Sequence, residues 1–170
     1  MAAGPKGPAL RRRSGTMKNM KKAFTAMVIA AAVLLSGLVA AQRAAGPTVE
    51  VFKSPTCGCC ALWVKHLEAN GFATKVTDVQ DISTVKAKYG VPGRLQSCHT
   101  AVVNGYVLEG HVPAADVQRL LKERPAVVGV AVPGMPVGSP GMEVGNTVQA
   151  YNVMTVDKQG QSTVFASHGR

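Results

Sequence analysis

Hydrophobic and polar positions follow two different periods in the middle of the chain. Residues 46–54 and 72–79 are rich in β-branched and aromatic side chains, which is typical of strands. Between them, residues 59–70 place apolar side chains at helical spacing, and a glycine, a common helix stop, follows. This part of the chain therefore predicts a strand, a helix and a second strand in succession.

The pattern continues toward residue 125. Residues 81–90 predict a short helix, and residues 99–112 predict a hairpin around Asn104-Gly105, the strongest short-range hairpin signal. Residues 113–125 predict a further helix with proline near each end. The order is β-α-β-α-β-β-α, so we predict an α/β domain of the thioredoxin-like class over residues 42–124.

The character of the chain changes after Pro125. Glycine and proline become frequent and helix signals are few, although residues 148–157 and 162–166 have the composition of short strands. We interpret residues 125–170 as an irregular extension, containing glycine, proline and methionine, that packs on the same domain.

Residues 1–41 have the order of a secretory signal peptide. A basic start with Lys18, Lys21 and Lys22 precedes an apolar run that ends in small residues, with cleavage expected after Ala41. Met17 is an alternative start. A retained membrane anchor is the alternative interpretation, and only then would the chain contact the membrane. Both interpretations place the domain outside the cytoplasm, in the periplasm.

The leader also explains most of the chain's charge. The formal net charge is +10, but seven basic and no acidic residues precede position 42, which leaves 12 basic against 9 acidic residues, or +3. This excess is too small to indicate nucleic-acid binding.

Three cysteines crowd one short stretch, "SPTCGCC", at the start of the first predicted helix. Helix N-termini lower thiol pKa values and stabilise thiolates, which serve both as redox nucleophiles and as soft-metal ligands. Cys57 and Cys60 alone would suit a dithiol switch. Cys59 argues against that role and favours a metal site, and we expect it to point elsewhere and bridge a second ion. The stretch thus predicts a small polynuclear thiolate cluster.

Cys98 and His99 precede the next predicted strand. In a thioredoxin-like sheet this loop faces the N-terminus of the first helix, so Cys98 becomes the fourth thiol and His99 a secondary ligand candidate. His111, after the hairpin, is another. Met135 and Met142 lie in the extension, and thioethers favour Cu(I) over zinc.

Three motifs together resemble the CopG-like, thioredoxin-fold metal-binding proteins of bacterial copper resistance. The motifs, spread over about residues 48–145, are "SPTCGCC", "GVPGRLQSCHTAVVNGYVLEGHVPAADVQRLL" and "GVAVPGMPVGSPGME". The resemblance implies periplasmic export, copper as ligand, a cluster of Cys57, Cys59 and Cys60 with Cys98, and redox activity between Cu(I) and Cu(II).

Three functions are therefore considered. The first is an exported copper-binding protein of copper resistance that holds Cu(I), with copper ions and other periplasmic copper-handling proteins as partners. The second is a periplasmic thiol–disulfide oxidoreductase that uses Cys57 and Cys60. The third is a zinc-stabilised interaction module.

Overall fold

The structure is a computed structural model that describes Met1 and residues 46–169. Apart from Met1, the expected leader over residues 1–41 and its cleavage site lie outside the described residues. Within the described part of the chain, no helix has the length and apolar character needed to cross a membrane.

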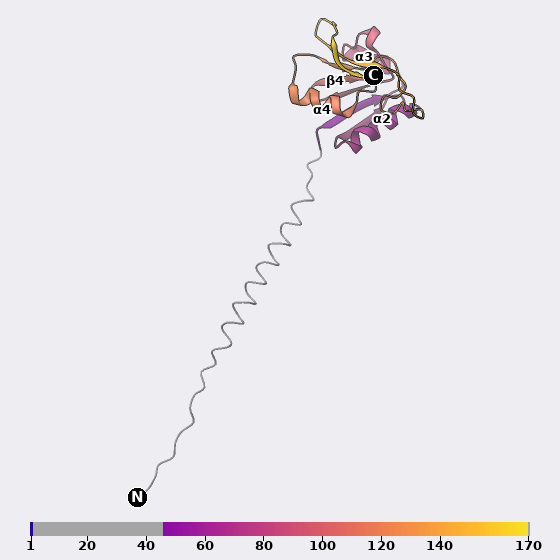
Figure 1. Ribbon diagram of the computed structural model, residues 1–170. Helices are drawn as coiled ribbons and strands as arrows, with labels where there is room; N and C mark the ends of the chain where they lie inside the picture. The colour runs from indigo at the N-terminus through magenta and orange to yellow at the C-terminus, as the bar shows by residue number, and fades with distance from the viewer. Residues whose placement is uncertain (2–45, 170) are drawn as a thin grey trace. The chain divides into compact units, whose positions relative to one another are not determined.

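Residues 46–169 form a seven-stranded mixed sheet in the order β2-β1-β3-β4-β5-β6-β7 (Figure 1). Pairs β1–β2 and β4–β5 are parallel and the other neighbours are antiparallel. The strands are β1 Thr48–Lys53, β2 Ala73–Asp78, β3 His99–Val103, β4 Tyr106–Glu109, β5 Gly129–Ala131, β6 Tyr151–Val156 and β7 Val164–His168. The helices are α2 Gly58–Ala69, α3 Ile82–Lys88, α4 Ala114–Glu123 and a 3₁₀ turn, η1, over Gly93–Leu95.

The main core lies between the sheet and helices α2 and α4. Side chains from alternate strand positions, among them Val51, Ala101 and Leu108, pack against Trp63 and Leu120 of these two helices. Helix α3 covers the opposite face of the sheet, where its C-terminal neighbour Tyr89 packs against Phe52 in a tilted arrangement, with ring centroids 5.9 Å apart. Since successive strand residues face opposite sides, each strand supplies side chains to both layers.

The predicted β-α-β-α-β-β-α order is confirmed, including the turn at Asn104 and Gly105, which both adopt left-handed backbone angles. The thioredoxin-like assignment itself stays an interpretation; the structure establishes a mixed α/β fold. The extension is less irregular than expected, because β5, β6 and β7 continue the same sheet beyond β4. Strand β5 was missed because it is only three residues long. Its Gly129 packs so closely on Val107 that a side chain there would collide with the Val107 carbonyl.

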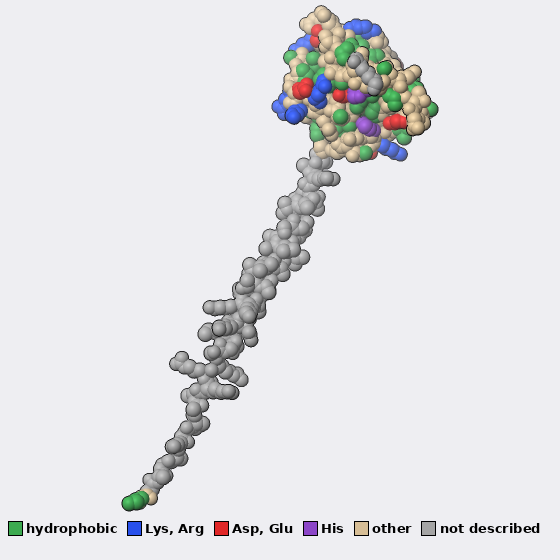
Figure 2. All heavy atoms as spheres, in the orientation of Figure 1, with side chains coloured by type: hydrophobic (Ala, Val, Ile, Leu, Met, Phe, Trp, Pro, Cys, Tyr) green, Lys and Arg blue, Asp and Glu red, His purple; other side chains and the backbone are tan. Residues whose placement is uncertain are grey.

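Basic and acidic side chains are interspersed with apolar ones on the face shown in Figure 2. This face therefore has the mixed surface expected from a small net charge in the described domain.

Candidate metal centre

The first part of the centre is the cysteine turn, residues Cys57–Cys60. Cys57 is the N-cap of α2 in an extended conformation, and its carbonyl accepts a hydrogen bond from the Ala61 N–H at 3.3 Å. Cys60 is fully buried in the first turn, whereas Cys57 and Cys59 are partly exposed. Cys57 and Cys60 form a disulfide, with their Cα atoms 5.4 Å apart, and Cys59 has a free thiol.

Cys98 brings a fourth sulfur to this turn from the residue before β3. The Sγ atoms of all four cysteines lie within 4.8 Å of one another. The expectation that Cys98 faces the helix start is confirmed. The expectation that Cys59 points elsewhere is wrong, because its Sγ lies 3.5 Å from that of Cys57 and within the same cluster. Cys60 points into the core at the start of α2, and the Cys59 sulfur lies toward the loop that carries Cys98.

The second part of the centre is the facing wall, formed by Cys98, His99 and His111. These three residues also meet the geometric requirement for a metal site, with one ligand atom of each within 4.8 Å of the others. The Cys98 Sγ lies 3.0 Å from Nε2 of His111 and 3.3 Å from Nδ1 of His99. Both histidines are fully buried.

The tautomer of neutral His111 follows from its contacts. Its Nδ1 lies 2.7 Å from the Pro140 carbonyl oxygen, which can only accept, so Nδ1 carries the proton. Nε2 then presents a lone pair to Cys98. A histidine that donates one ring N–H to a backbone carbonyl while its other nitrogen faces the site has the arrangement usual for metal ligands.

The electrostatics of the wall favour neutral groups in the absence of metal. Burial, and then the neighbouring Cys59, raise the pKa of the Cys98 thiol to about 11. Burial lowers the pKa of His111, and burial followed by His111 and Lys86 lowers the pKa of His99 well below its ordinary value. A metal ion would therefore displace a proton from Cys98 and meet imidazoles that are already deprotonated.

His99 leaves one buried polar atom unsatisfied. Its Nε2 has no hydrogen-bond partner among the described residues, and its ring centroid lies 4.3 Å from that of Trp63. An orphaned buried nitrogen costs free energy, and a functional role is one explanation for why a native structure tolerates it. The donor set of four sulfurs and two imidazoles suits a soft or borderline cation such as Cu(I) or zinc.

A segment of the extension, residues 133–143, closes over both parts and is called the strap here. Besides Pro140, it contacts the Cys98 loop at Gly134, whose carbonyl accepts a hydrogen bond from the Ser97 hydroxyl. Gly141 packs on the start of α2 with a left-handed φ of +84°. A Cβ there would lie 2.7 Å from the Cys59 carbonyl oxygen and 2.8 Å from the Trp63 nitrogen. The extension thus takes part in building the site.

The predicted methionine ligands, Met135 and Met142, both lie in the strap. Met135 is half exposed, and Met142 is partly buried. Their role as ligands stays a prediction.

Several features that contribute to the site were not predicted from the sequence. Pro140 acts through its carbonyl, which no side-chain motif reveals. A buried Lys86–Glu109 pair, with Nζ and Oε1 2.5 Å apart, lies behind the wall. Its signal was present, since Glu109 interrupts an apolar hairpin strand, "YVLEG". The complete burial of His111 was also not predicted, because a histidine after a hairpin is ordinarily exposed.

Comparisons with known proteins identify the family to which the chain belongs. A family described as "Protein of unknown function, DUF411" matches residues 95–142. No curated protein sequence matches the chain significantly. A solved structure of a copper resistance protein CopG, Form 2, is 50% identical, with a TM-score of 0.70, and the match covers 72% of this chain and 98% of that chain. Form 1 gives 50% identity, a TM-score of 0.69, and coverage of 73% and 99%. The chain therefore belongs to the CopG-like copper resistance family.

Proposed function

We propose that this protein binds copper as Cu(I) in the cup between the cysteine turn and the facing wall, and that this binding serves copper resistance. Thiolates of Cys57, Cys59, Cys60 and Cys98 are the principal ligands. His111 and His99 complete the set from the wall. Met135 and Met142 remain secondary candidates from the strap.

The observation that carries the proposal is the convergence of four cysteine sulfurs within 4.8 Å at the start of α2. Thiolates are soft ligands and bind the soft ion Cu(I) strongly. Several sulfurs at this spacing can also bridge more than one copper ion. The N-terminus of α2 favours the negative charge of the thiolates. The copper resistance proteins at 50% identity support copper over zinc.

The protein has two redox states, with and without the Cys57–Cys60 disulfide, and they offer different numbers of ligands to copper. With Cys57 and Cys60 joined, Cys59, Cys98 and the histidines can still offer ligands. A dithiol reductant supplies two electrons and two protons, is itself oxidised to a disulfide, and converts Cys57 and Cys60 into two thiols. The protons of these thiols leave as copper binds, so that four thiolates become available. Reduction should therefore raise both the capacity and the affinity of the cup for Cu(I).

A competitive Cu(I) titration tests this proposal. Fully reduced protein and protein with the Cys57–Cys60 disulfide are titrated against a chromogenic chelator without oxygen. The reduced form should bind at least one copper ion tightly and more than the oxidised form does. Less than one tightly bound ion per reduced chain would contradict the proposal, and preferential retention of zinc would favour the zinc-stabilised module.

The same disulfide favours a second candidate function, a thiol–disulfide oxidoreductase. A substrate thiolate would attack the partly exposed Cys57 sulfur, break the Cys57–Cys60 bond and form a mixed disulfide, because Cys60 is fully buried. A second substrate thiol would then displace Cys57, so the substrate gains a disulfide and the protein is left reduced. Oxidation of one equivalent of a dithiol peptide by copper-free protein that carries the Cys57–Cys60 disulfide would support this function, and its absence would exclude it.

The site of action in this proposal is the periplasm, reached through the leader, with other copper-handling proteins as partners. Fractionation of cells that express the full chain checks this, since exported protein should be released with the periplasmic fraction. Recovery only in the cytoplasmic fraction would contradict it.

A further inference from the structure

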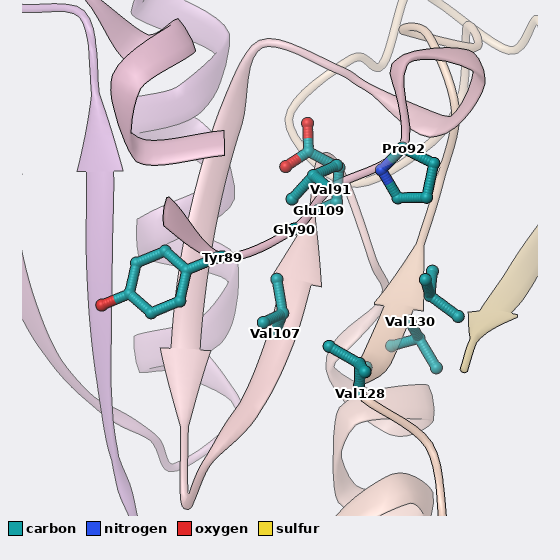
Figure 3. Close-up of a pocket in the computed structure, with 10 residues that line it drawn as sticks. Tyr89, Gly90, Val91, Pro92, Val107, Glu109, Val128 and Val130 are labelled. Carbon is teal, nitrogen blue, oxygen red and sulfur yellow. The ribbon is translucent and has the colours of Figure 1, made fainter. Parts of the chain in front are cut away.

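A buried ion pair lies behind the facing wall and belongs to neither cluster of candidate ligands. Lys86 of α3 and Glu109 of β4 are 3% and 1% exposed, with Nζ and Oε1 2.5 Å apart. A cavity of about 10 Å³ that Glu109 helps to line is too small for more than one water molecule. Figure 3 shows Glu109 with Val91, Pro92 and Val107 among the residues that line this cavity, most of which are apolar.

The carboxylate of Glu109 also organises the chain on either side of the wall. Its Oε1 accepts a hydrogen bond from the Ser97 backbone N–H at 2.6 Å, and its Oε2 accepts one from the Thr100 hydroxyl at 2.7 Å. The Thr100 oxygen in turn accepts from Lys86 Nζ at 3.2 Å. The network therefore joins α3, the loop before β3, and both strands of the hairpin.

Apart from Lys86, each member of this network is a close chain neighbour of a wall residue. Ser97 precedes Cys98, Thr100 follows His99, and Glu109 stands two residues before His111. Thr100 and Glu109 are directly paired across β3 and β4, and the Gly110 N–H donates to the His99 carbonyl oxygen at 3.0 Å. Because strand side chains alternate, Thr100 and Glu109 face the α3 layer while His99 faces Trp63 on the other side.

Stability alone is a weak reason for such a pair. Buried ion pairs are costly to desolvate, and apolar side chains of similar volume often serve a fold as well or better. What an apolar pair cannot provide is an acceptor for the Ser97 N–H, which fixes the peptide that leads into Cys98. The specific contribution of Glu109 is therefore the direction of hydrogen bonds, with Lys86 balancing its charge.

We propose that Glu109, with Lys86 as its counter-charge, is a positioning residue of the copper site that holds Cys98 and His111 at the correct distance from the cysteine turn. This inference rests on the proposed copper binding. It predicts that the wall loses its alignment when the acceptor is removed, even if the buried charges are removed as a pair.

Two matched double variants isolate the acceptor. Lys86→Met with Glu109→Gln removes both charges but retains a side-chain oxygen that accepts from the Ser97 N–H, while the amide N–H can donate to the Thr100 hydroxyl oxygen. Lys86→Met with Glu109→Leu removes both charges and the acceptor. Val153→Ala, in β6, serves as a stability control, since it removes buried packing two strands away from β4. All are prepared as the full chain in the reduced state, and their thermal unfolding is measured alongside.

The first readout is Cu(I) affinity by chelator competition. The Leu variant should bind at least about tenfold more weakly than the wild type, a loss typical for removal of an outer-shell partner. The Gln variant should recover most of that loss. The Val153→Ala control should unfold at a lower temperature but keep its copper affinity, which separates positioning from general stability.

The second readout needs no copper. The ring-nitrogen resonances of His99 and His111 in the reduced, copper-free protein should move in the Leu variant and return toward wild-type positions in the Gln variant. If the wild type binds no copper, the proposed function fails, and these resonances alone still decide the positioning role. Equal behaviour of the Gln and Leu variants in the readouts that apply would overturn the inference.

Discussion

The two parts of the proposed copper cup are built in contrasting ways. The cysteine turn is local: three thiols come from four consecutive residues, and the start of one helix presents them. The facing wall is assembled from the loop before β3, the first residue of β3 and the turn after β4, and its two histidines are fully buried. The turn depends on one helix, whereas the wall depends on the whole fold.

This difference separates the supply of ligands from their alignment. The turn carries the Cys57–Cys60 disulfide and is partly open to solvent, so it is accessible to thiols and to copper ions. The wall has its own supports, namely the Lys86–Glu109 pair behind it and the Pro140 carbonyl of the strap. Variants in the wall or its supports should therefore disturb copper binding more than their conservative nature suggests.

The largest effect is expected from Cys98→Ser, because Cys98 is common to both candidate clusters. Without this sulfur, no ligand is shared between the histidines and the cysteine turn. Cu(I) affinity should therefore fall by more than about 100-fold, which exceeds the loss usual when a residue outside the ligand set is changed. Cys59→Ser, matched in chemistry, should reduce affinity less, since it removes a ligand from one cluster only. Chelator competition measures both, and a greater loss for Cys59→Ser would reverse the proposed order of importance.

The next effect is expected at the strap. Gly141→Ala places a Cβ against the Cys59 carbonyl and the Trp63 nitrogen at a left-handed backbone position, so the strap should lift from α2. Copper affinity should fall about tenfold, and the free energy of unfolding should drop by about 1–3 kcal/mol. Urea unfolding and Cu(I) competition measure the two effects.

Gly134→Ala is the matched control for the strap. Gly134 also has a left-handed φ, +68°, but no atom lies within 4 Å of the position that an added methyl group would take. This variant should show only the backbone penalty of about 1–2 kcal/mol. If both variants weakened copper binding equally, contact between the strap and α2 would not matter for the site.

The features that could be predicted from the sequence are the local ones, like the cysteine turn, whereas those built from distant segments, like the wall, could not be fully predicted. The order of strands and helices through residue 124 and the cysteine turn depend on local periodicity and spacing, and both were predicted. Strand β5 and the fully buried state of His111 depend on contacts between distant segments. The Pro140 carbonyl illustrates this limit, because a backbone atom acquires its role only after the extension has folded over the hairpin.

The smallest effect is expected at the far end of α2. His66 Nε2 accepts a hydrogen bond from the Ala114 N–H at 3.0 Å, at the start of α4, and burial lowers the pKa of His66. When the pH is below 6.5, the ordinary pKa of histidine, the unfolded chain therefore binds more protons at His66 than the folded chain does. The contribution of His66 to stability is thus complete above pH 6.5 and is lost as the pH falls.

His66→Gln keeps an acceptor for Ala114 but does not titrate. Between pH 7 and pH 5 the variant should lose less stability than the wild type, by under about 1 kcal/mol because the ring is partly exposed. Its Cu(I) affinity at pH 7 should equal that of the wild type. Urea unfolding at both pH values tests this, and an identical pH dependence in the two proteins would show that His66 is not held neutral by the fold.

The central claim, that the two parts of the cup meet at the same copper, is tested most directly by X-ray absorption at the copper edge. Reduced wild-type protein loaded with Cu(I) should show a first shell dominated by sulfur, with a smaller nitrogen contribution that decreases in His111→Gln. A shell that contains sulfur alone in both proteins, or nitrogen and oxygen alone in the wild type, would contradict the account.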